Sequence, residues 1–231
     1  MTSARPLIVA IDGPAGAGKS TVSKLLARRL DFELVDTGAI YRCVALAARE
    51  RQIPFHDDER LGALLDALTI SFEAQGEDNH VYLDGRDVSA AIRTPENSLA
   101  ASQDSRRPVV RAGLLELQRR LALGAKRGAI LEGRDIGTVV FPDADLKFFL
   151  HADPAIRARR RQEELAGKGN HKSLEAVLKE QTQRDREDSE REAAPLKAAD
   201  DAVQIDSTAM PLAEVVQRLE LLVRAALSRR C

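Results

Sequence analysis

The sequence predicts an α/β fold: a doubly wound parallel sheet of five strands with helices on both faces. Short apolar runs alternate along the chain with segments of helical periodicity, an order typical of parallel sheets. A glycine-rich turn joins the first apolar run, residues 7–11, to the first helical segment, residues 19–30. The chain has 231 residues, 44% of them hydrophobic, which is enough for one such domain with embellishments.

The predicted strands and helices follow one another in order. Each strand is a short run of apolar, often β-branched residues, and each helix repeats apolar residues at spacings of three and four. The strands are residues 7–11, 34–36, 128–132, 146–150 and 202–206. The helices are residues 19–30, 39–51, 108–123, 154–165, 173–191 and 210–228. Parallel strands place their carboxyl ends at one edge of the sheet, where doubly wound folds bind ligands.

Two regions depart from this alternation. Short alternating runs around polar turns, from Thr69 to Ile92, predict a small antiparallel sheet. We therefore interpret residues 60–103 as an insert within a single domain that spans residues 1–231. The polar stretch 166–172 contains two glycines and is expected to end a short lid formed by residues 154–172.

Composition excludes several classes of protein. The formal net charge is −1 and tryptophan is absent, which argues against a protein that coats nucleic acid or stacks on its bases. Two cysteines supply neither a disulfide framework nor a zinc site. Neither a signal peptide nor a membrane-spanning run is recognised. We expect a cytoplasmic monomer whose partners are small molecules, not nucleic acids or membranes.

The strongest motif is a phosphate-binding loop of the form G-x-x-x-x-G-K-S, placed between a strand and a helix. Glycines let backbone N–H groups turn toward an anion, and the helix N-terminus adds a favourable dipole. Lys19 is expected to contact the β- and γ-phosphates of a nucleoside triphosphate, and the Ser20 hydroxyl to bind Mg²⁺. The residues predicted to bind this nucleotide are Gly13, Pro14, Ala15, Gly16, Ala17, Gly18, Lys19, Ser20 and Thr21. The guanine-selecting motif of a GTPase is not found, and the length suits a small-molecule kinase.

Charged clusters follow the second and third predicted strands. Thr37 and Arg42 are placed to bind the phosphate of an acceptor, although a helix cap with a surface arginine is the alternative. Arg134 and Asp135 come directly after the third strand, where Arg134 would take part in catalysis. A turn stabilised by local salt bridges is the alternative there.

Two helical segments carry further candidates. Arg184, Asp188 and Arg191 are spaced by four and three residues, so they share one helical face, which could also be a solvated salt-bridged surface. Arg157 and Arg161 precede the stretch 166–172 and are predicted to close over the transferring phosphate as catalytic residues. A basic helix without a catalytic role, or more weakly a nucleic-acid patch, is the alternative.

Taken together, the motifs resemble those of the bacterial cytidylate kinases, a family of nucleoside monophosphate kinases. The stretches that carry the resemblance run from the first strand almost to the last, so they cover nearly the whole chain. They are residues 11–20, 36–42, 92–94, 101–103, 110–111, 133–142, 184–185 and 194–196. The stretch 133–142 and the insert are the most specific of these features, because many families share the phosphate-binding loop.

The resemblance implies a P-loop kinase that transfers the γ-phosphoryl group of ATP to CMP, and also to dCMP. It also implies roles around the acceptor: residues at its phosphate are Arg42, Arg134 and Arg191, residues that recognise cytosine are Ser102, Arg111 and Asp135, and residues near the ribose are Arg184 and Asp188. Glu132, acidic at the end of the third strand, is compatible with a role on Mg²⁺ through water.

The expected mechanism needs no general base. A phosphate monoester has a second pKa of about 6, so the acceptor is already an anion near neutral pH. Catalysis would then depend on positioning and on charge stabilisation by Lys19, Mg²⁺ and arginines. The alternatives are a P-loop kinase of another acceptor, such as UMP or shikimate, and a nucleotide-binding regulatory protein, in which the acceptor-side arginines would be idle.

Overall fold

The structure is a computed structural model that describes residues 5–76, 78–167 and 169–230. Within these residues a five-stranded parallel sheet has the strand order β2-β6-β1-β7-β8. The strands are β1 (Leu7–Asp12), β2 (Glu33–Asp36), β6 (Gly128–Gly133), β7 (Leu146–His151) and β8 (Val203–Asp206). The predicted doubly wound α/β fold is confirmed, with all five strands within two residues of their predicted bounds.

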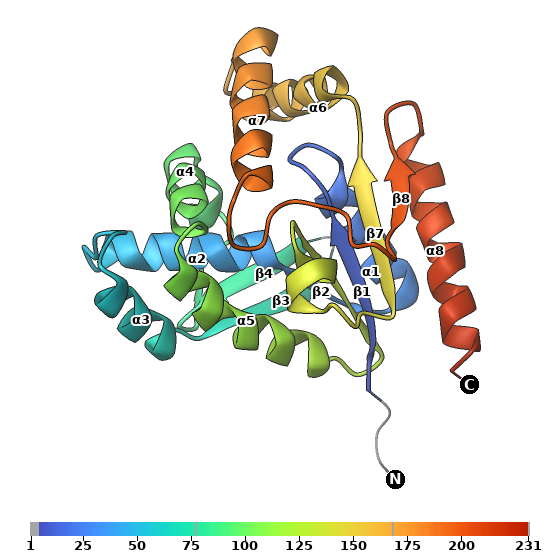
Figure 1. Cartoon of the computed structure of the whole chain (residues 1–231), viewed down its shortest axis with the longest axis horizontal. Coiled ribbons are helices and arrows are strands. Elements are labelled where there is room, and N and C mark those ends of the chain that lie inside the picture. The colour runs from blue at the N-terminus through green and yellow to red at the C-terminus, as the bar shows by residue number, and fades with distance from the viewer. Residues whose placement is uncertain (1–4, 77, 168, 231) are drawn as a thin grey trace.

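Helices cover both faces of this sheet (Figure 1). Successive residues of β1 point to opposite faces, so Val9 packs with one apolar core and Ala10 with the other. The helices α1 (Lys19–Leu30) and α8 (Leu212–Ser228) contribute to the core that contains Val9. The helices α2 (Thr37–Glu50) and α5 (Pro108–Leu123) contribute to the core that contains Ala10. None of the described helices is long and apolar enough to cross a membrane.

The predicted antiparallel sheet is confirmed and has the strand order β3-β4-β5. Its strands and the helical segments around it are α3 (Asp58–Ala67), β3 (Ile70–Gln75), β4 (Asp78–Leu83), β5 (Arg86–Asp87), η1 (Ala91–Arg93) and α4 (Pro95–Asp104). The helices α3 and α4 were not predicted. Helix α3 packs against α5 and helix α4 against α2, and both lie on the left of the molecule in Figure 1. The bounds of the insert, residues 60–103, remain a prediction.

Two helices, α6 (Pro154–Gly167) and α7 (Leu174–Ser189), stand beyond the carboxyl ends of the strands (Figure 1). Helix α7 ends two residues before its predicted end, because the chain turns back and the N–H of Leu196 donates to the carbonyl of Asp188 at 2.8 Å. Arg191 therefore lies beyond the helix and not on its face. Both helices fall in or next to the predicted lid, of which residue 168 lies outside the described residues.

One buried carboxyl group predicts a pH-dependent stability. Asp104 is fully buried in α4, one turn after Ala100, and neither carboxyl oxygen has a hydrogen-bond partner among the described residues. Burial raises its pKa from 3.8 to about 7. Folding therefore favours the protonated form, and the free energy of unfolding falls as the pH rises between these two values.

We expect Asp104→Asn to raise the free energy of unfolding at pH 8 by about 1–3 kcal/mol more than at pH 5, because the penalty for the carboxyl group grows over this interval. Urea unfolding at both pH values measures this difference. Asp143→Asn, on the surface, serves as the control. Equal effects of Asp104→Asn at pH 5 and pH 8 would contradict the prediction.

Candidate active site

The predicted phosphate-binding loop lies between β1 and α1, and its glycines are required by its geometry. Gly13 has φ +146°, and a Cβ there would lie 1.9 Å from the carbonyl oxygen of Leu150 in β7. Gly16 has φ +75°, and a Cβ there would lie 2.7 Å from the side-chain nitrogen of Gln181. Gly18 precedes α1 without a side-chain cap, which leaves the first amides of the helix available to an anion.

Lys19 and Ser20, the first residues of α1, lie beside Glu132 at the end of β6. The Lys19 ammonium donates to the carbonyl of Pro14 at 2.8 Å, so its side chain folds over the loop. Burial and the nearby Arg134 lower the pKa of Lys19 well below its usual value. Negative charge from a bound triphosphate would reverse this effect and favour the charged ammonium.

The pair formed by Ser20 and Glu132 fits a magnesium ion. The Ser20 hydroxyl donates to Glu132 Oε2 at 2.8 Å. Burial is the main cause that raises the pKa of the Glu132 carboxyl to about 7, with a smaller contribution from Asp36. The nearby Lys19 and Arg42 offset only part of this effect. A hydroxyl and a carboxylate are the oxygen ligands that Mg²⁺ prefers, with the remaining positions taken by water and phosphate. Among the described residues, no cluster of three or more His, Cys, Asp or Glu side chains forms a separate metal site.

Four predicted acceptor residues gather between α7, the end of β6 and the segment after α7. Arg134 Nε donates to Asp188 Oδ2 at 3.0 Å, and Arg191 Nη1 lies 3.6 Å from Asp188 Oδ1. The pKa of the Arg184 guanidinium is lowered to about 10, mainly by its partial burial and secondly by the nearby Arg134. Part of the Arg184 side chain remains exposed to solvent. Burial and Arg111 likewise lower the pKa of Arg191. Cations that crowd together in this way favour a polyanionic ligand.

Arg111 and Asp135 form a buried ion pair through Arg111 Nη2 and Asp135 Oδ2. The Arg111 guanidinium also lies 5.6 Å from the centroid of the Tyr41 ring and donates to the carbonyl of Ser105 at 3.0 Å. Both side chains are thereby fixed in orientation, as recognition of a planar base requires. Ser102 lies half-buried on α4. The hydrogen bonds of the Arg111 guanidinium go to Asp135 and to the carbonyl of Ser105 and not to Ser102. The role of Ser102 at cytosine remains a prediction.

Thr37 and Arg42 are placed differently from one another. The Thr37 hydroxyl is buried and donates to the carbonyl of Glu132 at 2.7 Å, so this donor is used within the protein. Arg42 Nη2 pairs with Asp36 Oδ2 at 3.2 Å, while Asp36 Oδ1 accepts from the N–H of Ala39 and caps α2. Asp36 therefore begins α2 at Thr37 and holds Arg42 beside the strand ends.

Arg157 is not free on a lid surface. Its guanidinium is buried and Nη1 donates to the carbonyl of Ala15, in the phosphate-binding loop, at 2.8 Å and to Asp185 Oδ2 at 2.6 Å. Arg161 is partly exposed and pairs with Glu164 on its own helix at 2.6 Å. Arg157 thus joins α6, α7 and the phosphate-binding loop. The catalytic roles predicted for both arginines remain predictions.

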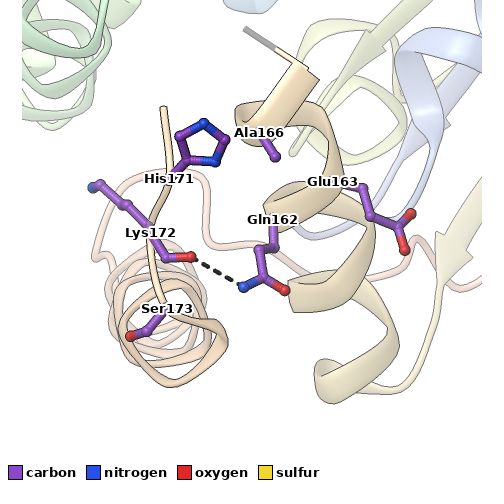
Figure 2. A pocket seen from close by; sticks show the side chains of 6 residues that line it. All are labelled: Gln162, Glu163, Ala166, His171, Lys172 and Ser173. Carbon is purple, nitrogen blue, oxygen red and sulfur yellow. Dashed lines mark hydrogen bonds between the residues drawn. The ribbon is translucent and has the colours of Figure 1, made fainter. Parts of the chain in front are cut away.

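A small pocket lies between α6 and the segment that leads into α7 (Figure 2). Across it the side chain of Gln162, on α6, donates to the carbonyl of Lys172 at 3.0 Å, which joins the two ends of the loop between α6 and α7. The residues that line the pocket are Gln162, Glu163, Ala166, His171, Lys172 and Ser173. None of them is a predicted site residue, so this pocket is separate from the residues predicted to bind the nucleotides.

Sequence reasoning missed three carboxylates that hold the site together: Asp12, Asp36 and Asp185. The Asp12 carboxylate accepts from the N–H groups of Ile136 and Gly137, directly after Asp135. A sequence signal existed for Asp12 and Asp36, because each is the last residue of a parallel strand, at the edge where doubly wound sheets bind ligands. No comparable signal marks Asp185, which depends on how α6 packs against α7.

A phosphate-binding loop at the end of a parallel sheet, faced by a cluster of arginines on a second set of elements, defines a P-loop kinase of a small acceptor. The family model described as cytidylate kinase matches residues 9–225, and the chain belongs to this family. It is 52% identical to the cytidylate kinase of Geobacter sp. (strain M21) over 96% of this chain and 95% of the relative. It is 53% identical to that of Geobacter sulfurreducens over 95% of this chain and 94% of the relative.

A solved structure of an uncharacterized protein from Eubacterium ventriosum superposes with a TM-score of 0.52 at 12% identity. It covers 96% of this chain and 99% of that protein. At this identity the similarity concerns the fold alone.

Proposed function

We propose that the protein transfers the γ-phosphoryl group of ATP to CMP, and also to dCMP, giving ADP and CDP or dCDP. The observation that carries this proposal is the buried pair of Arg111 and Asp135 beside the cations that follow β6 and α7. Membership in the cytidylate kinase family supports the same acceptor. The named relatives are cytidylate kinases that match nearly the full length of this chain.

Cytosine and uracil differ in the groups that this pair would meet. Cytosine has an amino donor at N4 and acceptors at N3 and O2, whereas uracil has an acceptor at position 4 and a donor at N3. The Asp135 carboxylate would accept from the N4 amino group, and the Arg111 guanidinium would donate to the ring acceptors. Uracil would leave buried polar groups unpaired, at a cost of about 1–3 kcal/mol for each.

The reaction is an in-line displacement at phosphorus. An oxygen of the acceptor phosphate forms a bond to the γ-phosphorus, while the bond to the oxygen that bridges to the β-phosphate breaks and ADP leaves. The acceptor oxygen is already deprotonated near neutral pH, so no side chain has to remove a proton. Lys19 and Arg134 would hold the donor and acceptor phosphates together and offset the charge that develops between them.

Magnesium would be held by the Ser20 hydroxyl, with Glu132 acting through water. When bound with ATP, the ion supplies charge neutralisation at the β- and γ-phosphate oxygens. Ser20 and Glu132 come from α1 and β6, so their contact fixes the start of α1 against the strand end that carries Arg134.

We also propose that residues 154–172 act as a lid and that the protein works as a cytoplasmic monomer. Exclusion of water is needed because water would otherwise compete with CMP for the phosphoryl group. Arg157 supports the coupling between lid and nucleotide, since it already contacts the carbonyl of Ala15. Light scattering at working enzyme concentration tests the monomer.

The first test is ATP-dependent ADP release with Mg²⁺ against CMP, dCMP, UMP, AMP, GMP and shikimate. We expect turnover on CMP and dCMP at a kcat/KM at least about tenfold above that of UMP, because one unpaired buried group costs about a factor of ten. A preference for another acceptor would keep the kinase but overturn the roles proposed for Arg111 and Asp135.

A further inference from the structure

Asp12, the last residue of β1, holds the start of the acceptor loop, which we define as residues 134–140. Its Oδ1 accepts from the N–H of Ile136 and its Oδ2 from the N–H of Gly137, both at 2.8 Å. Asp12 is 5% exposed, so both bonds are shielded from water. Gly13 follows it directly and begins the phosphate-binding loop. One carboxylate thus connects the nucleotide side of the site to the acceptor side.

The two amides depend on Asp12 for their hydrogen bonds. Residues Ile136–Val140 form one turn of π-helix, closed by bonds from the N–H groups of Val139 and Val140 to the carbonyl of Asp135. Amides at the start of such a turn have no partner within it. The Asp135 side chain does not cap the turn. Asp12 therefore supplies the acceptors that the turn itself lacks.

The position of Asp135 follows from this contact. Asp135 immediately precedes the two amides that Asp12 holds, and Arg134 precedes Asp135. The neighbouring strand also lies in register, with Asp12 opposite Gly133. A shift of the Ile136 and Gly137 amides would move the Asp135 carboxylate relative to Arg111, and an error of about 1 Å in such a group is enough to reduce activity.

We propose that Asp12 is a positioning residue that sets the orientation of Asp135 and Arg134 and so determines selectivity for the acceptor base. This inference rests on the proposed role of Asp135 at cytosine. Both oxygens of Asp12 accept from backbone amides, so we assign it no direct contact with either substrate. Its effect on acceptor choice is thus exerted through the acceptor loop.

A carboxylate is required at this position because both partners are donors. An asparagine offers one oxygen acceptor and one amino group, and the amino group would oppose an N–H. Space around the contact is limited as well, since a Cβ on Gly137 would lie 3.1 Å from Lys147 Cδ and 3.4 Å from Asp12 Oδ2. Burial raises the pKa of Asp12 to about 6, so the carboxylate is ionised at pH 8. The titratable groups that face it are Asp135 and Lys19.

The test is Asp12→Asn, assayed at pH 8 with saturating ATP and with CMP and UMP as acceptors. We expect kcat/KM for CMP to fall about 10- to 100-fold, the range for one charge-assisted hydrogen bond, with a higher KM for CMP. We expect the CMP-to-UMP ratio of kcat/KM to fall at least about threefold, because uracil does not use the lost orientation.

Asp145→Asn is the matched control. Asp145 Oδ2 accepts from the N–H of Ile8 at 2.7 Å, so it serves the same strand, β1, near its other end. We expect this variant to unfold at a lower temperature with an unchanged CMP-to-UMP ratio. If Asp12→Asn behaves like the control, with lower stability and an unchanged ratio, Asp12 is a structural residue only and the inference is wrong.

Gly137→Ala tests the same contact if Asp12→Asn does not fold. The added methyl group presses on Asp12 Oδ2 and Lys147, and we expect the same fall in the CMP-to-UMP ratio. An unchanged ratio in a folded Gly137→Ala protein would count against the inference. If the unaltered protein shows no preference for CMP, the proposed function fails first, before any variant is compared.

Discussion

Lys19→Met is expected to reduce kcat by about 1,000-fold or more, a loss comparable to removal of a cation that stabilises phosphoryl transfer. The variant keeps the length and the apolar stem of the side chain and removes only its charge. Lys19 is buried at the phosphate-binding loop, where low polarity strengthens the interaction of its ammonium with phosphate oxygens. The measurement is steady-state turnover of ATP with CMP, together with the affinity for an ATP analogue.

Lys24→Met is the matched control for this variant. Lys24 lies on the same helix, α1, about one turn further on, and pairs with Asp78 on the surface at 2.7 Å. An exposed pair of this kind contributes at most about 1 kcal/mol. We expect this variant to have near-normal kcat and stability. A Lys19→Met protein with a kcat close to that of Lys24→Met would refute the role assigned to the phosphate-binding loop.

The parts of the fold that could be predicted are those that a short stretch of consecutive residues determines. The apolar runs of β1 and β6 and the glycines of the phosphate-binding loop need only a few consecutive residues to be recognised. Helices α3 and α4 were missed because their buried positions are sparse: α3 buries only Leu61 and Leu64, and α4 buries small or polar residues. Local start signals were present, since Asp57 caps α3 and Thr94 caps α4, but the packing of these helices against α5 and α2 is not visible in a local pattern.

For the candidate site, the types of residue were predictable, but their hydrogen-bond and ion-pair partners were not. Arg134 and Asp188 are separated by 54 positions, and only the placement of α7 over β6 brings them together. The Thr37 hydroxyl is predicted to lie at the acceptor phosphate, and the sequence did not indicate the hydrogen bond that it donates to the carbonyl of Glu132. Backbone groups at strand ends compete for such side chains, and a sequence does not show which of them lack a partner.

Asp135→Asn is expected to lower kcat/KM for CMP by about 100- to 1,000-fold, because breaking a buried ion pair leaves one charge uncompensated. Arg111 would lose its partner while its guanidinium stays over the Tyr41 ring. The substitution also places an amino group where, in our proposal, the carboxylate accepts from the N4 amino group of cytosine. The kcat/KM for UMP should fall much less, because uracil has an acceptor oxygen at position 4.

The decisive quantity is therefore the ratio of kcat/KM for CMP to that for UMP, which separates base recognition from general damage. Loss of stability alone would lower both values together, and thermal unfolding measures that contribution. Asp87→Asn provides the comparison, since Asp87 is a partly exposed carboxylate on β5 that pairs with His80. If the CMP-to-UMP ratio in Asp135→Asn equals that in Asp87→Asn, Asp135 does not recognise the base. The buried pair of Arg111 and Asp135 then only fixes α5 to the acceptor loop. If the ratio falls toward one or reverses, a single carboxylate accounts for most of the discrimination between the two pyrimidines.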